Sequence, residues 1–359
     1  MKKKKKAALY NPYLDVLGGG EKHILSMMQV LENQGYELCI FWDQDLSQEI
    51  DTRLNLHFQN LHFIPNIFKW SSPIKKLHKL ASFDIFFYVT DGSYFFSTAK
   101  RNFVFCMVPN KNLYRMNTVN QCKTYGYRFI SNSVYTQKWL QEWGIDTTVI
   151  YPYVNQTLIE TDLSKITKEK IILSVGRFFP HLHSKKHEIM LDAFKIFNKK
   201  NPDYMFILAG GLKEEDKPYF NTLKKKTSDM KNVILKANVS FNELQKLYRV
   251  SSYFWHFTGY GVNENQNPHI VEHLGMTPLE AMATGTIPFC YNAGGPKEII
   301  LDGKNGYLFK DIAELVKKQE HILSHPNIYQ QMQQQCQRTA KEEFSFEVFE
   351  KRVINVLLK

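Results

Sequence analysis

The sequence of 359 residues lacks an apolar run of about 18 residues or more, so no transmembrane helix is predicted. Its five cysteines are odd in number and lack Cys-x-x-Cys spacing, which favours free thiols in a reducing cytoplasm. No secretory signal is expected, because Lys2–Lys6 lead directly into the strand-like Ala7–Tyr10. These absences argue against an integral membrane protein and against a disulfide-stapled secreted protein.

Acidic residues are in deficit: 35 Asp and Glu stand against 46 Lys and Arg, a formal net charge of +11. Nucleic acid, an anionic membrane surface or a phosphorylated substrate would each explain such an excess. No nucleic-acid motif is present, so no nucleic-acid partner is expected. Part of the excess is the Lys2–Lys6 run, which also fits a solvated, mobile terminus. Hydrophobic content of 43% is ordinary for a globular protein, and the length suits two domains.

The most informative stretch contains two glutamates, Glu272 and Glu280, with seven residues between them. A single helix across both is disfavoured, because Pro278 would disrupt it and Gly275 permits unusual backbone angles. The pattern predicts a loop carrying Glu272, a helix starting near Met276–Thr277, and Glu280 one turn inside that helix. A loop that leads into a helix N-terminus is where open α/β sheets bind phosphates, so a nucleotide-sugar site is indicated.

The residues that follow support a βα arrangement. Gly285 is expected to end the helix, and Ile287–Tyr291 reads as the next strand. A second glycine turn, Asn292–Gly295, follows, and Pro296 opens another short helix.

The N-terminal part begins like a Rossmann unit. Ala7–Tyr10 reads as a strand, Gly18–Gly20 as a glycine loop entering an amphipathic helix, and Glu37–Trp42 as the next strand. The spacing Gly-Gly-Gly-Glu-Lys-His is not the Gly-x-Gly-x-x-Gly of dehydrogenases. A glycine loop that lets backbone approach a diphosphate or an incoming acceptor is therefore preferred.

A second strand–loop–helix unit starts at Lys170–Val175. Arg177 follows this strand directly, and Lys185 precedes the helix expected at Glu188–Lys199. Both cations could be surface charges, but their position at the carboxyl end of a strand favours contact with phosphate.

Taken together, these motifs resemble the retaining family-4 glycosyltransferases of the GT-B fold. The resemblance rests on Glu-x7-Glu followed by Ala-Met-Ala-Thr-Gly285, and on Asn292-Ala-Gly-Gly-Pro-Lys-Glu-Ile299. Gly18-Gly-Gly-Glu-Lys-His23, Ser174-Val-Gly-Arg177 with Lys185, and Asp302–Phe309 are similar to further family motifs in family order. The resemblance spans roughly residues 7–310.

The resemblance implies an α/β fold of two Rossmann-like doubly wound domains that face a central cleft. The domains are expected at 1–152, for the acceptor, and at 153–344, for the donor, with a last helix at 345–359 returning to the first. A polar stretch through Lys170 is interpreted as the interdomain linker. The implied activity is retaining, metal-independent transfer of a hexose from a nucleoside-diphosphate sugar to a hydroxyl, in cell-surface glycan or glycolipid synthesis.

The resemblance also assigns roles to residues. Glu272 should contact the donor sugar, and Glu280 the ribose hydroxyls. Arg177 and Lys185 should meet the diphosphate. The backbone of Met276, Thr277 and Gly275, and that of Gly19 and Gly20, complete the expected donor site. Cofactors and metals are not expected, and the partners implied are the nucleotide sugar and a glycan or lipid-linked acceptor.

Three patterns remain outside this scheme. Many relatives place a histidine where this chain has Met107–Asn110, which leaves the acceptor-side residue unassigned. Asp43-Gln-Asp45 matches a metal motif of a different glycosyltransferase fold and is interpreted as a solvated loop. His181, His183 and His187 are interpreted as a polar loop rather than a metal site.

Residues 56–81 mix aromatic and aliphatic side chains with lysines, and two interpretations stay open. Phe68 and Trp70 could insert into a membrane interface while Lys69, Lys75, Lys76 and Lys79 contact anionic headgroups, which would place the protein at the inner membrane face. Alternatively, the segment is a surface helix that buries its apolar face in its own domain.

Other functions were weighed against glycosyl transfer. Two carboxylates also fit a glycoside hydrolase, although phosphate-suited loops disfavour it. A GT-B nucleotide-sugar epimerase and a non-catalytic nucleotide-sugar binding module are the remaining alternatives. The motifs specify neither the base, the sugar nor the acceptor.

Overall fold

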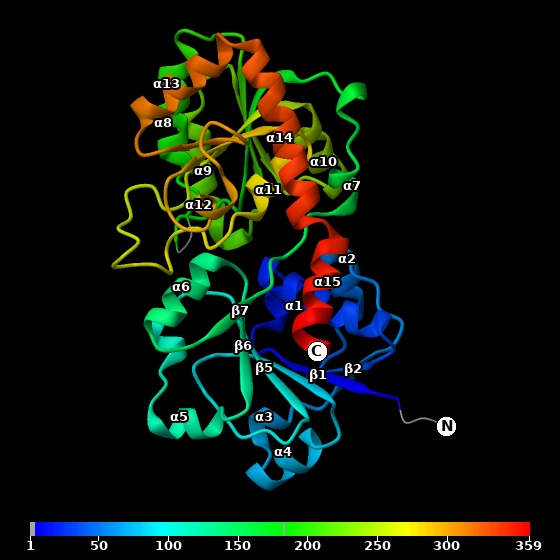
Figure 1. The fold of residues 1–359 in the computed structure, drawn as a ribbon. Coiled ribbons are helices and arrows are strands. Elements are labelled where there is room, and N and C mark those ends of the chain that lie inside the picture. The colour runs from blue at the N-terminus through cyan, green and yellow to red at the C-terminus, as the bar shows by residue number, and fades with distance from the viewer. Residues whose placement is uncertain (1–3, 182–183) are drawn as a thin grey trace. The chain divides into compact units, whose positions relative to one another are not determined.

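The computed structural model describes residues 4–181 and 184–359, and the side chain of Trp70 is also outside the description. The expectations for Lys2, Lys3, His183 and the Trp70 ring therefore fall outside the described residues. The chain divides into two compact units, Met1–Pro152 with Phe349–Lys359 (unit 1) and Tyr153–Val348 (unit 2). Each unit is a parallel sheet with helices on both faces (Figure 1).

Unit 1 holds a seven-stranded sheet in the order β3-β2-β1-β4-β5-β6-β7, and every pairing is parallel. The strands are β1 (Lys6–Tyr10), β2 (Glu37–Phe41), β3 (Leu61–Ile64), β4 (Ile85–Val89), β5 (Arg101–Cys106), β6 (Tyr127–Ser131) and β7 (Thr147–Val149). All five residues of β4 are buried, as expected for a central parallel strand covered by helices on both faces.

The helices of unit 1 are short apart from two. They are α1 (Gly19–Asn33), α2 (Ser47–Leu54), α3 (Ile67–Trp70), α4 (Pro73–Leu80), α5 (Thr118–Lys123), α6 (Val134–Glu142) and α15 (Phe346–Leu358), whose residues from Phe349 onward belong to this unit. The Ser133 hydroxyl accepts a 3.0 Å hydrogen bond from the Thr136 N–H and caps α6.

Phe68 is partly buried and packs against the core of unit 1, which corrects its proposed insertion into a membrane. Its ring stacks on Tyr10 with 4.0 Å between centroids and meets Phe41 edge-on at 5.2 Å. The surface-helix interpretation therefore holds for Phe68, while Ile74 on α4 is 79% exposed. None of the helices formed by the described residues is long and apolar enough to cross a bilayer.

Unit 2 holds a six-stranded parallel sheet in the order β10-β9-β8-β11-β12-β13. The strands are β8 (Glu169–Val175), β9 (Met205–Gly210), β10 (Val233–Ala237), β11 (Ser251–His256), β12 (Ile287–Tyr291) and β13 (Tyr307–Phe309). The helices are α7 (Gln156–Ile159), α8 (His187–Asn198), α9 (Lys217–Lys226), α10 (Phe241–Val250), α11 (Met276–Ala283), α12 (Pro296–Ile299), α13 (Ile312–Leu323) and α14 (Pro326–Phe344). The core centres on Trp255, which is fully buried against Phe206 and Phe194.

The polar stretch expected to be an interdomain linker is part of unit 2, so that expectation is wrong. Leu158 and Ile159 of α7 are buried, and Gln337 donates a hydrogen bond to the Thr161 carbonyl at 2.5 Å. Lys168 is buried as well: its Nζ donates to the Thr286 hydroxyl at 2.7 Å, and burial lowers its pKa to about 7. The sequence suggested a linker because the stretch is polar. The long-range partners of its polar residues exist only in the folded unit and cannot be seen in the sequence.

Candidate donor site

The candidate site lies at the point in unit 2 where the strand order reverses, between β8 and β11. Gly176 and Arg177 follow the carboxyl end of β8, and His256 is the last residue of β11. Lys185 lies just before α8, and Glu272 lies in the loop before α11 (Figure 1). Ligands of open α/β sheets bind at this kind of crevice, so the topology alone marks the place.

Lys185 and Glu272 form the centre of this site. Nζ of Lys185 lies 2.7 Å from Oε2 of Glu272, and the two side chains are 17% and 21% exposed. Nε2 of His256, a residue only 1% exposed, lies 3.1 Å from the same oxygen. Two of the three residues assigned to the catalytic centre from sequence therefore meet directly, and a histidine that sequence reasoning missed joins them.

A glycine makes room for the lysine. A Cβ placed on Gly176 would lie 2.4 Å from Cγ and 2.9 Å from Cε of Lys185, so the lysine stem lies across this residue. Gly210, at the end of β9, approaches Gly176 so closely that a Cβ would lie 1.8 Å from the Gly176 carbonyl oxygen. The two glycines thus set the path by which Lys185 reaches Glu272.

The surroundings of Glu272 and His256 shift the pKa values of both side chains. Burial opposes ionisation of Glu272, but the Lys185 charge and the contact with His256 hold its pKa well below its usual range. Burial lowers the pKa of His256, with the Lys185 charge adding to the effect and Glu272 opposing it. At neutral pH the cluster is a carboxylate between an ammonium and a neutral imidazole.

The second glycine turn fixes the backbone of Glu272. Gly295 N–H donates a 2.8 Å hydrogen bond to the Glu272 carbonyl, and a Cβ on Gly294 would lie 2.1 Å from that same oxygen. Glu264 accepts a 2.7 Å hydrogen bond from the Gly294 N–H and also contacts Lys297. The polar loop before Glu272 and the Asn292–Gly295 turn are therefore one joined structure.

The helix expected near Met276–Thr277 begins at Met276. Gly275 precedes it with φ of +107°, a conformation that L residues with side chains rarely adopt. Among the described residues, no hydrogen bond is recorded to the backbone N–H of Met276 or Thr277. These first-turn N–H groups can therefore donate hydrogen bonds to an anionic ligand, as helix N-termini do.

Glu280 lies inside α11 and is held by a residue of the neighbouring helix. The Tyr248 hydroxyl on α10 donates a 2.8 Å hydrogen bond to Oε2 of Glu280. Tyr248 is 1% exposed, and burial together with the Glu280 charge raises its pKa well above its usual range. The tyrosine therefore stays protonated and acts as a donor.

Arg177 is exposed, and its guanidinium lies 4.8 Å from the centre of the Phe179 ring. No ion pair of Arg177 is recorded within the described part of the chain. It stands next to Gly176 and is available to an incoming phosphate, but it does not join the Lys185–Glu272 pair.

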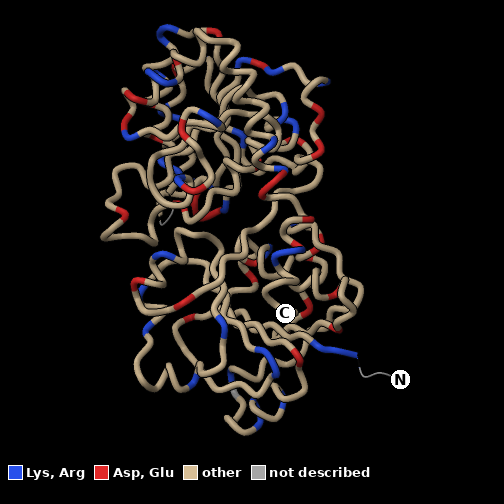
Figure 2. The backbone as a smooth tube through the Cα atoms, in the orientation of Figure 1, with Lys and Arg blue, Asp and Glu red and all other residues tan. Residues whose placement is uncertain are grey.

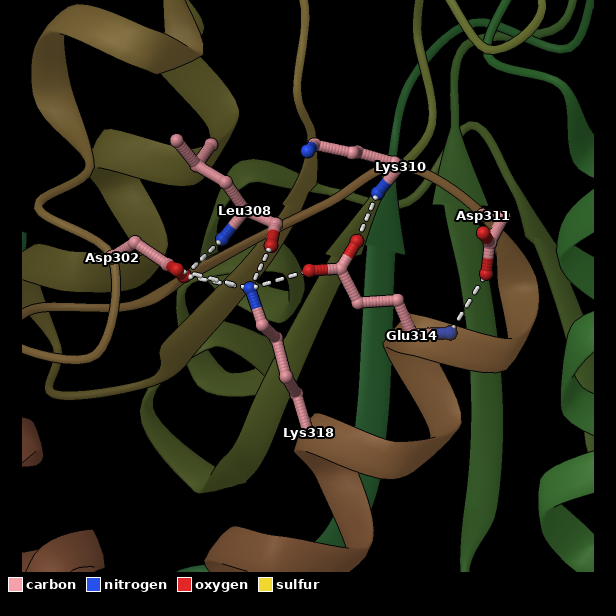
Figure 3. Close-up of polar contacts among 6 residues, drawn as sticks. All are labelled: Asp302, Leu308, Lys310, Asp311, Glu314 and Lys318. Carbon is pink, nitrogen blue, oxygen red and sulfur yellow. Dashed lines mark hydrogen bonds and ion pairs between the residues drawn. The ribbon is translucent and has the colours of Figure 1, made fainter.

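The turn and strand at Asp302–Phe309 are anchored by Lys318 on α13 (Figure 3). Nζ of Lys318 lies 3.0 Å from Oδ2 of Asp302, 2.9 Å from Oε1 of Glu314 and 2.6 Å from the Leu308 carbonyl oxygen. The backbone of β13 is in turn joined to the second glycine turn by the hydrogen bond from Asn292 N–H to Phe309 O, at 2.9 Å. Lys318 is therefore linked to the glycine turn through β13.

Gly19 and Gly20 belong to unit 1, apart from the other assigned residues. Gly20 is needed for packing, since a Cβ there would lie 2.1 Å from Sδ of Met107. At Gly19 no described atom comes within 4 Å of a Cβ position, so this glycine is open. The Gly18 N–H is capped by Oε2 of Glu21 at 2.9 Å, which accounts locally for the loop-to-helix turn.

Two further histidine and aspartate assignments can be checked. His187 is 2% exposed at the start of α8 and stacks on Phe178, so it is not part of a polar loop. Asp43 is exposed, as expected. Its Oδ1 accepts a 2.8 Å hydrogen bond from the Asn66 N–H, and its Oδ2 lies 3.1 Å from Nζ of Lys69.

The residues that sequence reasoning missed are His256, Tyr248, Glu264 and Lys318. His256 gave a usable signal: it is a polar residue at the carboxyl end of a strand, directly after the aromatic run Tyr253–Trp255. The other three act through partners distant in sequence, which a single sequence does not reveal.

The fold is that of a two-unit α/β protein, and the strand order of its second unit reverses between β8 and β11, beside Arg177, Lys185 and the start of α11. The model of the family Glycosyl transferases group 1 matches residues 155–342, just over half of the chain and nearly all of unit 2. The chain belongs to this family.

Curated relatives and solved structures agree with that placement. The chain is 31% identical over 192 residues to a GDP-Man:Man(3)GlcNAc(2)-PP-Dol alpha-1,2-mannosyltransferase of Xenopus laevis, covering 50% of this chain and 37% of the relative. It is 26% identical over 220 residues to an alpha-1,3/1,6-mannosyltransferase ALG2 of Dictyostelium discoideum, covering 54% and 47%. The chain thus spans less than half the length of these relatives.

A crystal structure of a glycosyltransferase from Rickettsia africae ESF-5 matches with a TM-score of 0.74 at 16% identity, covering 98% of this chain and 97% of that one. At this identity the match shows the fold, and it confirms the expected GT-B glycosyltransferase architecture of two Rossmann-like units.

Proposed function

We propose that this protein transfers a hexose from a nucleoside-diphosphate sugar to a hydroxyl acceptor, with retention of anomeric configuration. The observation that carries the proposal is the Lys185–Glu272 pair at the strand-order reversal of unit 2, beside the free first-turn N–H groups of α11. Family membership supports glycosyl transfer. Both curated relatives are named as mannosyltransferases, so mannose is the first sugar to test.

The chemistry needs positive charge where the diphosphate leaves. As the bond between the sugar and the diphosphate oxygen breaks, negative charge develops on that oxygen. Lys185, Arg177 and the N–H groups of Met276 and Thr277 would stabilise it without a metal ion. In front-face attack, the acceptor oxygen bonds to the anomeric carbon while the leaving diphosphate takes the acceptor proton.

Glu272 and Glu280 would hold the two ends of the donor. The Lys185 ammonium donates to Oε2 of Glu272, and Nε2 of His256 lies near the same oxygen. No hydrogen bond to Oε1 is recorded among the described residues. Oε1 can therefore accept a hydrogen bond from a sugar hydroxyl. Glu280, with one oxygen held by Tyr248, would accept from the ribose hydroxyls.

The test is a donor screen followed by a turnover assay. GDP-mannose, UDP-glucose and related nucleotide sugars are first ranked by thermal stabilisation, and the best donor is then incubated with lipid-linked and free sugar acceptors. The proposal predicts acceptor-dependent release of the nucleoside diphosphate and a product with the donor's anomeric configuration. Conversion of the donor without an acceptor would indicate an epimerase, and binding without any turnover would indicate a binding module.

A lipid-linked acceptor is the first class to test, because the frog relative's name includes a PP-Dol acceptor. Such an acceptor would fit peripheral attachment to the inner face of the membrane through the α4 region of unit 1, where Lys and Arg segments appear in Figure 2. Lys75 and Lys79 are exposed there, whereas Lys69 pairs with Asp43 and Lys76 donates to the Phe68 carbonyl.

Liposome co-sedimentation tests this attachment. Binding should require anionic lipid and weaken at high salt, because each lysine near such a surface adds about 1 kcal/mol. Changing Lys69, Lys75, Lys76 and Lys79 to glutamine should release the protein, while four glutamines in unit 2, at Lys213, Lys217, Lys225 and Lys231, should not. Equal sedimentation of both variants would disprove the role of α4.

A further inference from the structure

Oε2 of Glu272 has two polar neighbours that differ in accessibility. Nζ of Lys185 donates a hydrogen bond to it, whereas Nε2 of His256 lies 3.1 Å away without a recorded hydrogen bond. Lys185 is 17% exposed and can reach a ligand, whereas His256 is 1% exposed and cannot. Any role of His256 in the reaction must therefore pass through Glu272.

Lys185 and His256 also differ in their expected response to a bound diphosphate. A diphosphate carries at least two negative charges and competes with Glu272 for the Lys185 ammonium. If Lys185 turned to the phosphate, Glu272 would lose its ionic partner in a largely buried place. A buried carboxylate without a donor is destabilised and tends to take up a proton. A protonated Glu272 would no longer act as the charged acceptor for a sugar hydroxyl.

His256 is placed to prevent this loss. A carboxylate oxygen only accepts hydrogen bonds, and Nε2 of His256 lies 3.1 Å from it as a buried nitrogen without a hydrogen-bond partner among the described residues. In the tautomer with its proton on Nε2, the imidazole can therefore become a donor to Glu272. Its neighbours are the strand partner Cys290, whose buried thiol has a pKa raised well above its usual range, together with Glu272 and Lys185. His256 therefore lies near the Glu272 carboxylate and the Lys185 ammonium. A diphosphate attracts only the ammonium.

We propose that His256 is a positioning residue that keeps Glu272 ionised and oriented after the donor's diphosphate has drawn Lys185 away. This inference rests on the proposed function for its role in turnover. It assigns the two contacts of Glu272 to successive stages: Lys185 holds the carboxylate in the empty site, and His256 holds it in the loaded site.

The matched variants are His256→Phe, which keeps an aromatic ring without a donor, and His256→Gln, whose amide can donate from a similar position. Affinity for GDP or UDP should change less than about threefold in both, because the diphosphate contacts Lys185 and not His256. In His256→Phe, kcat should fall roughly tenfold to a hundredfold, and the acid limb of its pH profile should move to higher pH. His256→Gln should recover most of both.

Equal kcat and an equal acid limb in His256→Phe and the wild type would overturn the inference. A defect of the same size in His256→Gln as in His256→Phe would overturn it as well. It would show that a side-chain hydrogen-bond donor at position 256 does not restore function.

A second measurement is independent of turnover and therefore separates this inference from the proposed function. Carboxyl ¹³C signals of labelled glutamate, with Glu272 assigned by its Gln variant, are titrated with pH in saturating inorganic pyrophosphate. The pKa of Glu272 should rise in His256→Phe and stay low in His256→Gln. In Lys185→Met, which keeps His256, Glu272 should remain ionised at neutral pH. Protonation of Glu272 at neutral pH in Lys185→Met would show that His256 cannot hold it.

Discussion

The Tyr248 hydroxyl donates a 2.8 Å hydrogen bond to Oε2 of Glu280, joining helix α10 to helix α11. Because burial keeps Tyr248 protonated, this contact fixes one oxygen of the carboxylate. Glu280 is therefore built as an oriented acceptor.

Glu280→Gln should weaken donor binding with little loss of fold. The amide oxygen can still accept from Tyr248, but a charge-assisted hydrogen bond to ribose, worth about 1.5–3 kcal/mol, is lost. Calorimetric titration should show a dissociation constant raised by roughly tenfold to a hundredfold. Glu215→Gln, at an exposed position, is the matched control, and an unchanged constant in Glu280→Gln would remove Glu280 from the site.

Gly176→Ala should impair the site through Lys185. The new methyl group must push the lysine stem aside, since the two would otherwise lie 2.4 Å apart. We expect donor affinity to fall about tenfold, equivalent to ~1.4 kcal/mol, with a small change in melting temperature, because a side chain can move.

Two neighbouring glycines serve as controls for Gly176→Ala. Gly210→Ala would meet backbone at 1.8 Å and should destabilise unit 2, whereas Gly211→Ala meets only Cγ of Arg177 at 3.7 Å and should be mild. Equal donor affinity in Gly176→Ala and the wild type would show that donor binding does not require the Lys185 stem to lie across Gly176.

Activity should persist in excess EDTA. The charge of the diphosphate is assigned to Lys185, Arg177 and the N-terminus of α11, and Asp43 already bonds to Asn66 N–H and Lys69. Initial rates with and without chelator provide the measurement. Loss of turnover that magnesium or manganese restores would require a metal and would return Asp43 and Asp45 to consideration.

Unit 2 should lose stability as pH falls below about 6.5, in part through His187. Burial, aided by the Lys185 charge, lowers its pKa to about 3 in the folded state, against about 6.5 when unfolded. Between these values the unfolded chain binds a proton that the folded chain does not, so acid favours unfolding by up to about 1.4 kcal/mol per pH unit. His187→Phe should flatten this slope in denaturant titrations, whereas exposed His78→Phe should not. Identical slopes would contradict the assignment.

The sequence predicted the strands and helices around the site well, because parallel strands buried on both faces form continuous apolar runs. The start of α11 at Met276 followed from Gly275 and Pro278, and strand β12 followed from the run Ile287–Tyr291. The linker assignment failed, because local polarity cannot show that Lys168 finds Thr286 across the fold.

Lys185 was assigned to the candidate site from its position relative to a strand, and Glu272 from the resemblance and its loop before a helix. The structure brings these two residues together at 2.7 Å. His256 and Tyr248 were missed as site residues because their roles depend on contacts with residues 16 and 32 positions away. The membrane and surface-helix interpretations of Phe68 both stayed open because exposure cannot be read from composition. In the structure its ring stacks on Tyr10.

The central claim is that the crevice around Lys185 and Glu272 binds the diphosphate of a nucleotide-sugar donor. Calorimetric titration of GDP and of UDP into the wild type and into Lys185→Met tests it most directly. At least one nucleoside diphosphate should bind the wild type, and Lys185→Met should weaken that binding about tenfold or more, since a charge-assisted contact of about 1.5–3 kcal/mol is lost. Binding of equal strength to both proteins would contradict the account.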